Sequence, residues 1–131
     1  MGVPATTFAQ TAADLLRQGN IPYKLGGKDL KGMDSAGFIS YCLGACGEKA
    51  RYRSSSEIYQ GAGPVHDLDM KRIVPGMIVL SVDSSGKAVY SAICYAPGQA
   101  AYPSEKLKAL TGFEINAKRF NKMLFCKHVD Y

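Results

Sequence analysis

The amino-acid sequence predicts an α+β domain in which N-terminal helices pack on a C-terminal antiparallel β-sheet. Three observations lead to this fold class. Apolar residues recur at helical spacing in the first half of the chain. From Ile73 onward, β-branched apolar runs alternate with turn residues. The length of 131 residues lies within the usual range for one domain, so we expect residues 1–131 to fold as a single domain.

The first half of the chain predicts two substantial helices. The first is expected over residues 7–18, where Thr6 or Thr7 can cap the N-terminus. The second is expected to begin near Ser35 and to run to about Leu43, because cap-type residues stand directly before an apolar-rich run. Between the two helices, prolines and paired glycines predict a loop.

The rest of the chain predicts one more helix and then the sheet. A serine cap followed by an acidic residue at 54–57 indicates a short third helix. Strands are expected at 76–81 and 89–95, with further strands within 113–116 and 122–129. Helices that come first and strands that follow favour an antiparallel sheet.

Composition and charge indicate a globular protein and make one function, nucleic-acid binding, the least favoured. Hydrophobic residues make up 47% and charged residues 21%, which is typical of a globular protein and not of a disordered one. The net charge of +5 favours anionic partners in general. The basic residues are spread along the chain without a base-reading motif, so nucleic-acid binding is the least favoured function.

The sequence also bears on location and on cofactors. The first twenty residues lack a basic segment followed by an apolar one, and no stretch approaches about 18 apolar residues. We therefore expect no signal peptide, no membrane span and synthesis in the cytoplasm. The cysteines form no C-x-x-C pair and stand near no histidine cluster, which predicts reduced and mostly buried thiols, no disulfide, no metal and no cofactor. The four are Cys42, Cys46, Cys94 and Cys126.

Four short fragments stand in an order that is informative when they are taken together. They are Pro22–Gly27 (P-Y-x-x-G-G), Gly32–Gly37 (G-x-D-S-A-G), Pro75–Val79 (P-G-x-I-V) and Tyr90–Cys94 (Y-S-A-I-C). This order resembles P-Y-x-x-G-G, G-x-D-C-S-G, P-G-D-[LI]-V and H-V-G-I-Y of the NlpC-type family of cell-wall (peptidoglycan) cysteine peptidases, over roughly residues 8–104. The resemblance implies a papain-like fold, with a nucleophile at a helix N-terminus and a base on the facing sheet.

The resemblance also indicates that the catalytic positions are replaced. The nucleophile position is Ser35, the base position is Tyr90, and the third polar position is Tyr102. Tyr23 and Asp34 match positions that shape the substrate pocket in the family, although a loop tyrosine and a helix cap explain them equally well. A serine gains less than a thiol from a helix dipole and needs a general base to attack an amide. Phenols ionise only near pH 10, so a tyrosine cannot be that base at neutral pH.

These observations lead to two main hypotheses. The first is a catalytically degenerate NlpC-like domain that acts in binding or assembly, in a phage or mobile-element particle that delivers it to the cell wall. Its expected partner is a cell-wall peptide or another protein of the assembly. The alternative is an active cell-wall peptide hydrolase, in which Ser35 is the nucleophile or an engineered replacement of a catalytic cysteine. Replacement of three separate polar groups favours the first. Cys42, seven residues after Ser35, is expected in the core and not at the site.

Overall fold

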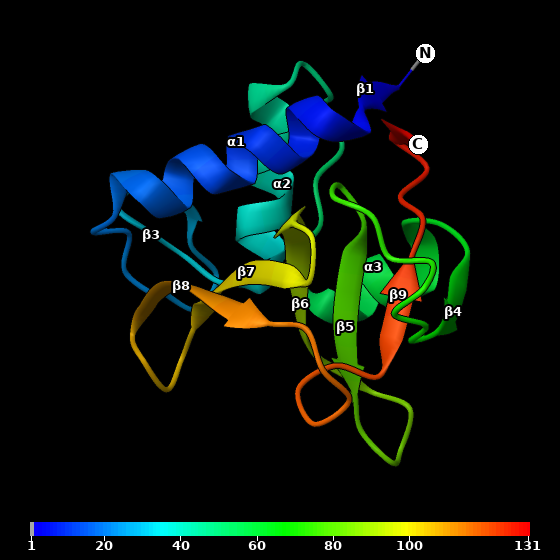
Figure 1. The fold of residues 1–131 in the computed structure, drawn as a ribbon. Coiled ribbons are helices and arrows are strands. Elements are labelled where there is room, and N and C mark those ends of the chain that lie inside the picture. Colours follow the sequence, from blue (N-terminus) through cyan, green and yellow to red (C-terminus); the bar gives the residue numbers. More distant parts are fainter. Residues whose placement is uncertain (1) are drawn as a thin grey trace.

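The computed structural model describes residues 2–131, in which three helices accompany a six-stranded sheet (Figure 1). The helices are α1 (Ala5–Gln18), α2 (Ser35–Ala45) and α3 (Ser55–Gly61). The strands are β1 (Val3–Pro4), β2 (Lys28–Asp29), β3 (Gly32–Met33), β4 (Val65–Asp67), β5 (Ile78–Val82), β6 (Ala88–Ala96), β7 (Gln99–Ser104), β8 (Ala109–Glu114), β9 (Lys122–Leu124) and β10 (Val129–Asp130).

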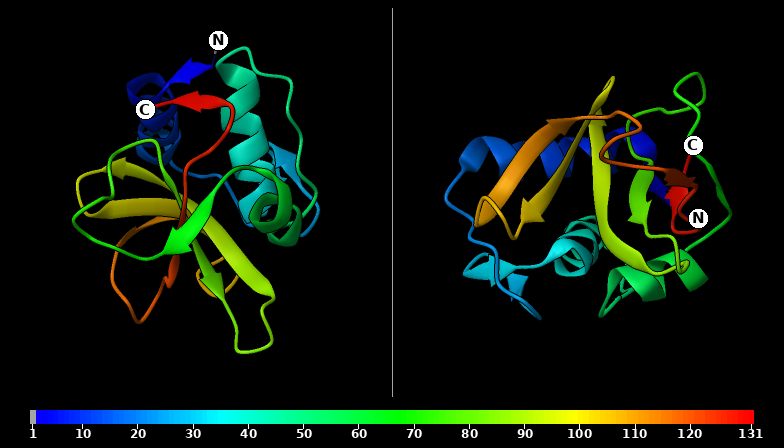
Figure 2. Two further views of the ribbon diagram at one scale, coloured as in Figure 1. Left: turned by 90° about the vertical axis from the view of Figure 1, so that its right-hand side faces the viewer. Right: turned by 90° about the horizontal axis from the view of Figure 1, so that it is seen from below.

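The main sheet has the order β4-β9-β5-β6-β7-β8, and every neighbouring pair is antiparallel. All three helices contact β6, the longest strand, so the sheet is organised around it. Strands β1 and β10 pair in parallel and bring the two ends of the chain side by side, as Figure 2 shows. The predicted α+β class, with N-terminal helices on a C-terminal antiparallel sheet, is confirmed.

Helix α1 starts earlier than the sequence predicted. It begins at Ala5 after Pro4, and no side chain caps its N-terminus, so the predicted threonine cap is wrong. Thr6 and Thr7 already lie within the first turn. The helix ends as expected at Gly19, where a φ of +73° suits a residue without a Cβ atom.

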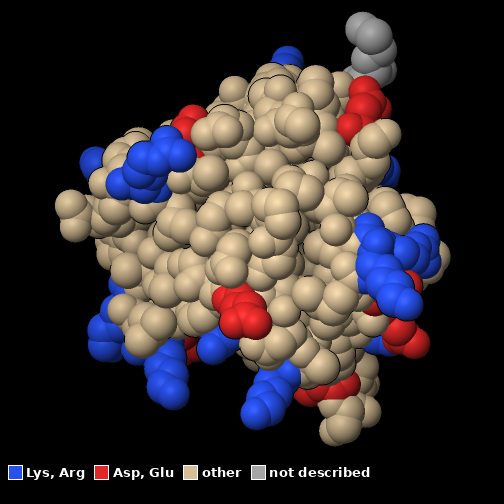
Figure 3. Space-filling model, viewed as in Figure 1, with Lys and Arg blue, Asp and Glu red and all other residues tan. Residues whose placement is uncertain are grey.

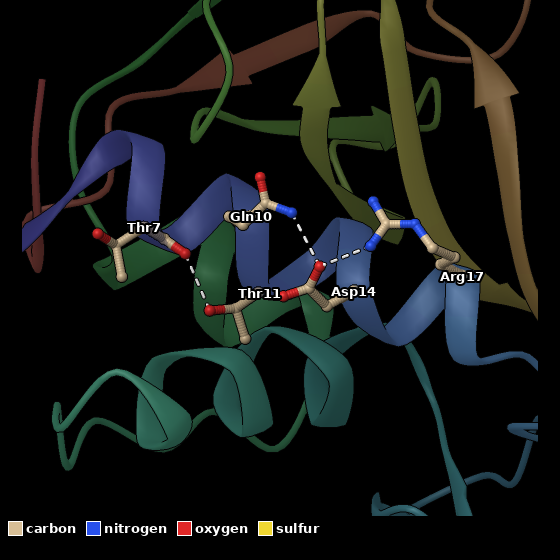
Figure 4. Close-up of polar contacts among 5 residues, drawn as sticks. All are labelled: Thr7, Gln10, Thr11, Asp14 and Arg17. Atoms are coloured by element: carbon tan, nitrogen blue, oxygen red, sulfur yellow. Dashed lines mark hydrogen bonds and ion pairs between the residues drawn. The ribbon is translucent and has the colours of Figure 1, made fainter.

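Helix α1 carries polar contacts between its own side chains and backbone (Figure 4). The Asp14 carboxylate accepts hydrogen bonds from the Gln10 amide at 2.8 Å and from the Arg17 guanidinium at 3.0 Å. The Thr11 hydroxyl donates to the Thr7 carbonyl oxygen at 2.9 Å. The two side-chain contacts of Asp14, at spacings of four and three residues, stabilise the helix locally, and the apolar face of α1 packs on the core.

Side chains alternate between two apolar clusters on the two faces of the main sheet. One face packs on the helices through residues such as Leu80 and Ile93, which meet Phe38 of α2 in one cluster. The other face forms a second cluster that includes Ala92 and Cys94. Adjacent residues on β6 therefore face opposite sides of the sheet, one toward the helices and the next toward the second cluster.

The strand boundaries differ from the predicted ones where pairing decides them. Strand β7 (Gln99–Ser104) was not predicted, because it contains two alanines, which have low strand propensity, and Pro103. Pairing with β7 shifts the next strand from 113–116 to Ala109–Glu114. The predicted run at 122–129 divides into β9 and β10, and the short β4 was also missed.

Most of the thiols lie in the core. Cys42, Cys94 and Cys126 are buried, Cys46 is half-buried, and all four are free thiols.

None of the helices in residues 2–131 has both the length and the apolarity needed to cross a membrane. On the face seen in Figure 3, the basic side chains lie scattered around the edge and do not gather into one patch.

Candidate functional site

A pocket of about 740 Å³ lies at the N-terminus of α2, between the loop before this helix and strands β6 and β7. All five site residues that the sequence pointed to line it. They are Tyr23, Asp34, Ser35, Tyr90 and Tyr102. The structure thus brings together residues from four separate segments, although proximity alone does not assign them a chemical role.

Asp34 joins the loop to the start of α2. It is the N-cap residue of the helix, and its Oδ1 accepts the Gly37 N–H at 2.8 Å. Its Oδ2 accepts the Gly26 N–H at 2.9 Å. Gly37 itself lies so close to the loop that an added Cβ would be 2.0 Å from the Gly27 carbonyl oxygen. Both carboxylate oxygens of Asp34 therefore accept hydrogen bonds from backbone N–H groups, which favours the interpretation of this residue as a helix cap.

Tyr23 lies half-buried beside Asp34 in the pocket wall. Burial raises its pKa, and the negative charges of Glu105 and Asp34 raise it further. The phenol therefore stays protonated at neutral pH and can donate a hydrogen bond to a ligand.

Ser35 is the first residue of α2, as predicted, and its side chain ends a short chain of hydroxyl groups. Its Oγ lies 3.0 Å from Oγ of Ser55, which lies 2.9 Å from Oγ of Ser91. All three serines are buried, with Ser91 fully so. A hydroxyl can donate one hydrogen bond and also accept, so the central Ser55 can do both and the two bonds link the three side chains without a charged group. Within residues 2–131, the hydroxyl of Ser35 thus bonds to another serine and to no imidazole or carboxylate.

Tyr90 and Tyr102 form part of an aromatic stack on the opposite face of the sheet. Their rings are parallel, with centroids 4.6 Å apart and an interplanar angle of 5°. Phe113 stacks on Tyr102 at 4.9 Å, and Phe120 meets both tyrosines edge-on. The Tyr90 hydroxyl donates to the carbonyl oxygen of Arg119 at 2.5 Å. Burial raises the pKa of Tyr102, against a smaller opposing effect of Arg119.

Sequence analysis missed three residues of this site. Ser55 and Ser91 complete the hydroxyl chain, and Arg119 lines the pocket with its guanidinium 3.9 Å above the Phe113 ring. The alternation of β6 could have placed Ser91 on the face opposite Tyr90. No local signal connects Arg119 with Tyr102, because the two come together only through the tertiary fold.

The other nucleophilic and basic candidates lie elsewhere. Cys42 is fully buried and is a core residue, as predicted, and this burial raises the pKa of its thiol well above its ordinary value. His128 does not line the pocket, and its Nε2 lies 2.8 Å from the Tyr52 hydroxyl. His66 is exposed and packs edge-on against Phe125. Within residues 2–131, no group of three or more metal-binding side chains gathers around a common point.

Comparisons with known proteins identify the fold. No protein-family model matches the chain, and no curated protein matches it in sequence. Among solved structures, the NlpC/p60 domain of the peptidoglycan hydrolase SagA superposes with a TM-score of 0.73 at 18% identity, covering 94% of this chain and 99% of that one. The P60 domain of an antigen from Mycobacterium avium subspecies paratuberculosis gives a TM-score of 0.74 at 17% identity, covering 97% and 98%.

A third similar structure is RipD from Mycobacterium tuberculosis, described as a non-catalytic NlpC/p60 domain protein with an adaptation to peptidoglycan binding. It gives a TM-score of 0.68 at 15% identity and covers 90% of this chain and 96% of its own. A peptidoglycan hydrolase and a non-catalytic protein thus share this architecture, so the fold alone does not decide activity. What the superpositions establish is the fold itself: the chain has the NlpC/p60 fold that the order of its four sequence fragments predicted.

Proposed function

We propose that the chain is a non-catalytic NlpC/p60-fold domain whose pocket binds peptidoglycan peptides. The observation that carries the proposal is the hydroxyl chain of Ser35, Ser55 and Ser91. It satisfies the side chain at the nucleophile position without any group that could accept a proton at neutral pH.

The acidic residues of the pocket do not supply the missing base. Both oxygens of Asp34 accept backbone N–H groups, and its role is to cap α2. Glu105 lies on the Tyr23 side of the pocket, where its charge raises the pKa of that phenol. Tyr90, at the base position, donates a hydrogen bond to a carbonyl oxygen. Without a base, the Ser35 hydroxyl has no route to a nucleophilic alkoxide.

The similarity to RipD supports a binding role, because that protein has the same fold and is described as non-catalytic and adapted to peptidoglycan binding. The pocket, at about 740 Å³, is within the size range of small-ligand sites. Delivery of the domain to a cell wall by a phage or mobile-element particle, or by a partner protein, remains a prediction from the sequence.

Co-sedimentation with insoluble peptidoglycan tests the proposal. The matched variants are Val89→Asp and Val74→Asp, because both valines are exposed but only Val89 lines the pocket. We expect the unaltered protein and Val74→Asp to sediment equally, and Val89→Asp to sediment at least severalfold less, because it places a hydrated carboxylate at the ligand surface. An unaltered protein that stays in the supernatant would contradict the proposal, as would equal sedimentation of the two variants.

A further inference from the structure

The pocket has an unequal distribution of charge. Four basic side chains line it against two acidic ones. The basic residues are Arg53, Lys87, Lys106 and Arg119, and the acidic residues are Asp34 and Glu105. Since Asp34 already accepts two backbone N–H groups, the charge balance favours an anionic ligand group over a cationic one.

Arg119 is the basic residue that the structure positions most firmly. Its guanidinium lies over the Phe113 ring at 3.9 Å, and its carbonyl oxygen accepts the Tyr90 hydroxyl. Its backbone N–H donates to Oδ1 of Asn116 at 3.1 Å. Backbone and side chain are therefore both held before any ligand arrives, which lowers the entropic cost of binding.

The guanidinium nevertheless retains unused hydrogen-bond donors. Its one side-chain contact with a polar atom is a long bond of 3.5 Å to the Tyr102 hydroxyl. Among residues 2–131, the ion pairs involve Arg17, Lys122 and His128, and Arg119 pairs with no carboxylate. A guanidinium has five N–H donors in a planar fork that matches a carboxylate. Stacking on Phe113 occupies a face of the guanidinium and uses none of these N–H donors.

The rim of the pocket indicates what surrounds this anionic group. Leu25, Val89 and Leu107 all line the pocket and expose 80%, 57% and 54% of their surface. Exposed apolar side chains gathered at a pocket mark a contact surface for apolar ligand groups. A carboxylate beside aliphatic groups is the chemistry of a peptide end, whereas a phosphate or a nucleic acid would not use the aliphatic rim.

We propose that Arg119 is the anion-binding residue of the pocket and holds the terminal carboxylate of a peptide, whose aliphatic side chains contact the rim formed by Leu25, Val89 and Leu107. This inference rests on the proposed function and names the ligand group that the pocket recognises. The two tyrosines at the replaced catalytic positions are then positioning residues: Tyr90 holds the backbone of Arg119, and Tyr102 supports the ring on which the guanidinium lies.

Titrations followed by NMR test this with two defined probes, N-acetyl-alanyl-alanine and its C-terminal amide. The probes differ in the carboxylate alone. We expect the acid to shift the resonances of Arg119, Phe113 and Ser35 and to bind about tenfold more tightly than the amide, as the loss of one charge-assisted interaction implies. Equal affinity for the acid and the amide would overturn the proposal, and so would acid binding that leaves the Arg119 resonances unmoved.

Arginine variants sharpen the test. Arg119→Gln should reduce the affinity for the acid about tenfold and leave the affinity for the amide unchanged, and Arg119→Lys should fall between because it keeps the charge without the fork. Arg17→Gln is the matched control, since Arg17 is exposed on α1 and pairs with Asp14. A loss of acid binding in Arg17→Gln equal to that in Arg119→Gln would contradict a specific site. Should Arg119→Gln fail to fold, the acid and amide titrations of the unaltered protein still decide.

The outcomes separate this inference from the proposed function. If the unaltered protein sediments with peptidoglycan but does not distinguish the acid from the amide, the role of Arg119 is wrong and the binding function stands. If the acid binds through Arg119 but peptidoglycan is not bound, the carboxylate site stands and its peptide comes from another source.

Discussion

Tyr90 and Ser91 are neighbours on β6, yet they belong to two regions with different chemistry. Ser91 faces the helices and ends a buried chain of hydroxyls that leads through Ser55 to Ser35. Tyr90 faces the other way and stacks on Tyr102. The first region satisfies its own polar groups. The second leaves unused donors on Arg119 at the pocket.

Under the proposed function, the difference explains how a pocket of this fold can bind a ligand without catalysis. Catalysis needs a nucleophile and a base that act as a unit. Here Ser35, which the sequence resemblance assigns to the nucleophile position, hydrogen-bonds within the fold. Tyr90, which it assigns to the base position, donates to the backbone carbonyl oxygen of Arg119. Under the proposed function, the hydroxyl chain is a structural feature and ligand recognition belongs to the aromatic side.

The largest effect is expected from Tyr102→Ala on the aromatic side. Tyr102 is 6% exposed and lies between the rings of Tyr90 and Phe113, so truncation leaves a cavity in the stack. We expect unfolding to require about 3–5 kcal/mol less free energy, measured by chemical denaturation. Tyr102→Phe keeps the ring and loses only the long bond to Arg119, so it should cost less than about 1 kcal/mol. Equal effects of the two variants would show that the hydroxyl, and not the stack, matters.

The second-largest loss of stability is expected from a substitution at the N-terminus of α2. Gly37→Ala places a methyl group 2.0 Å from the Gly27 carbonyl oxygen, so the loop that carries Tyr23 must move. We expect a loss of about 3 kcal/mol in unfolding free energy. Gly44→Ala is the matched control on the same helix, where nothing lies within 4 Å of the new methyl group, and it should stabilise by up to about 1 kcal/mol. A neutral Gly37→Ala would contradict the tight junction of loop and helix.

On the hydroxyl side, Ser55→Ala should remove both bonds of the chain at once. It leaves the hydroxyls of Ser35 and Ser91 without their partner, so we expect a loss of about 2 kcal/mol. The neighbouring Ser56→Ala should change stability by less than about 0.5 kcal/mol, because Ser56 is only half-buried. If the two variants unfold alike, the chain is not a structural feature.

How far the sequence predicted this molecule can be judged from particular residues. Ser35 at the helix start and the strands around Ile78 and Ile93 were predictable, because caps and apolar runs are local signals. Strand β7 was not, since its alanines gain strand structure only from pairing on both sides. Arg119 lies 29 residues from Tyr90 in sequence, and only the folded sheet shows that the two are bonded.

The smallest effect is expected at Cys94, which lies on the same face of the sheet as Tyr90. Cys94 is fully buried there, and burial raises the pKa of its thiol from 9.0 to about 11. The neutral thiol therefore favours the fold fully below pH 9, and this contribution is lost as the pH rises towards 11. We expect about 1 kcal/mol of lost unfolding free energy at pH 10, and Cys94→Ala should abolish that part. An identical pH dependence in Cys94→Ala would mean that water reaches this face.

Hydrolysis of soluble peptidoglycan peptides, followed by mass spectrometry, tests the central claim most directly. We predict that the unaltered protein releases no product, like Ser35→Ala, and that Ser35→Cys restores little or none, because a thiol without an imidazole partner lacks a base. Robust hydrolysis by the unaltered protein that Ser35→Ala abolishes would contradict the claim and establish a serine hydrolase.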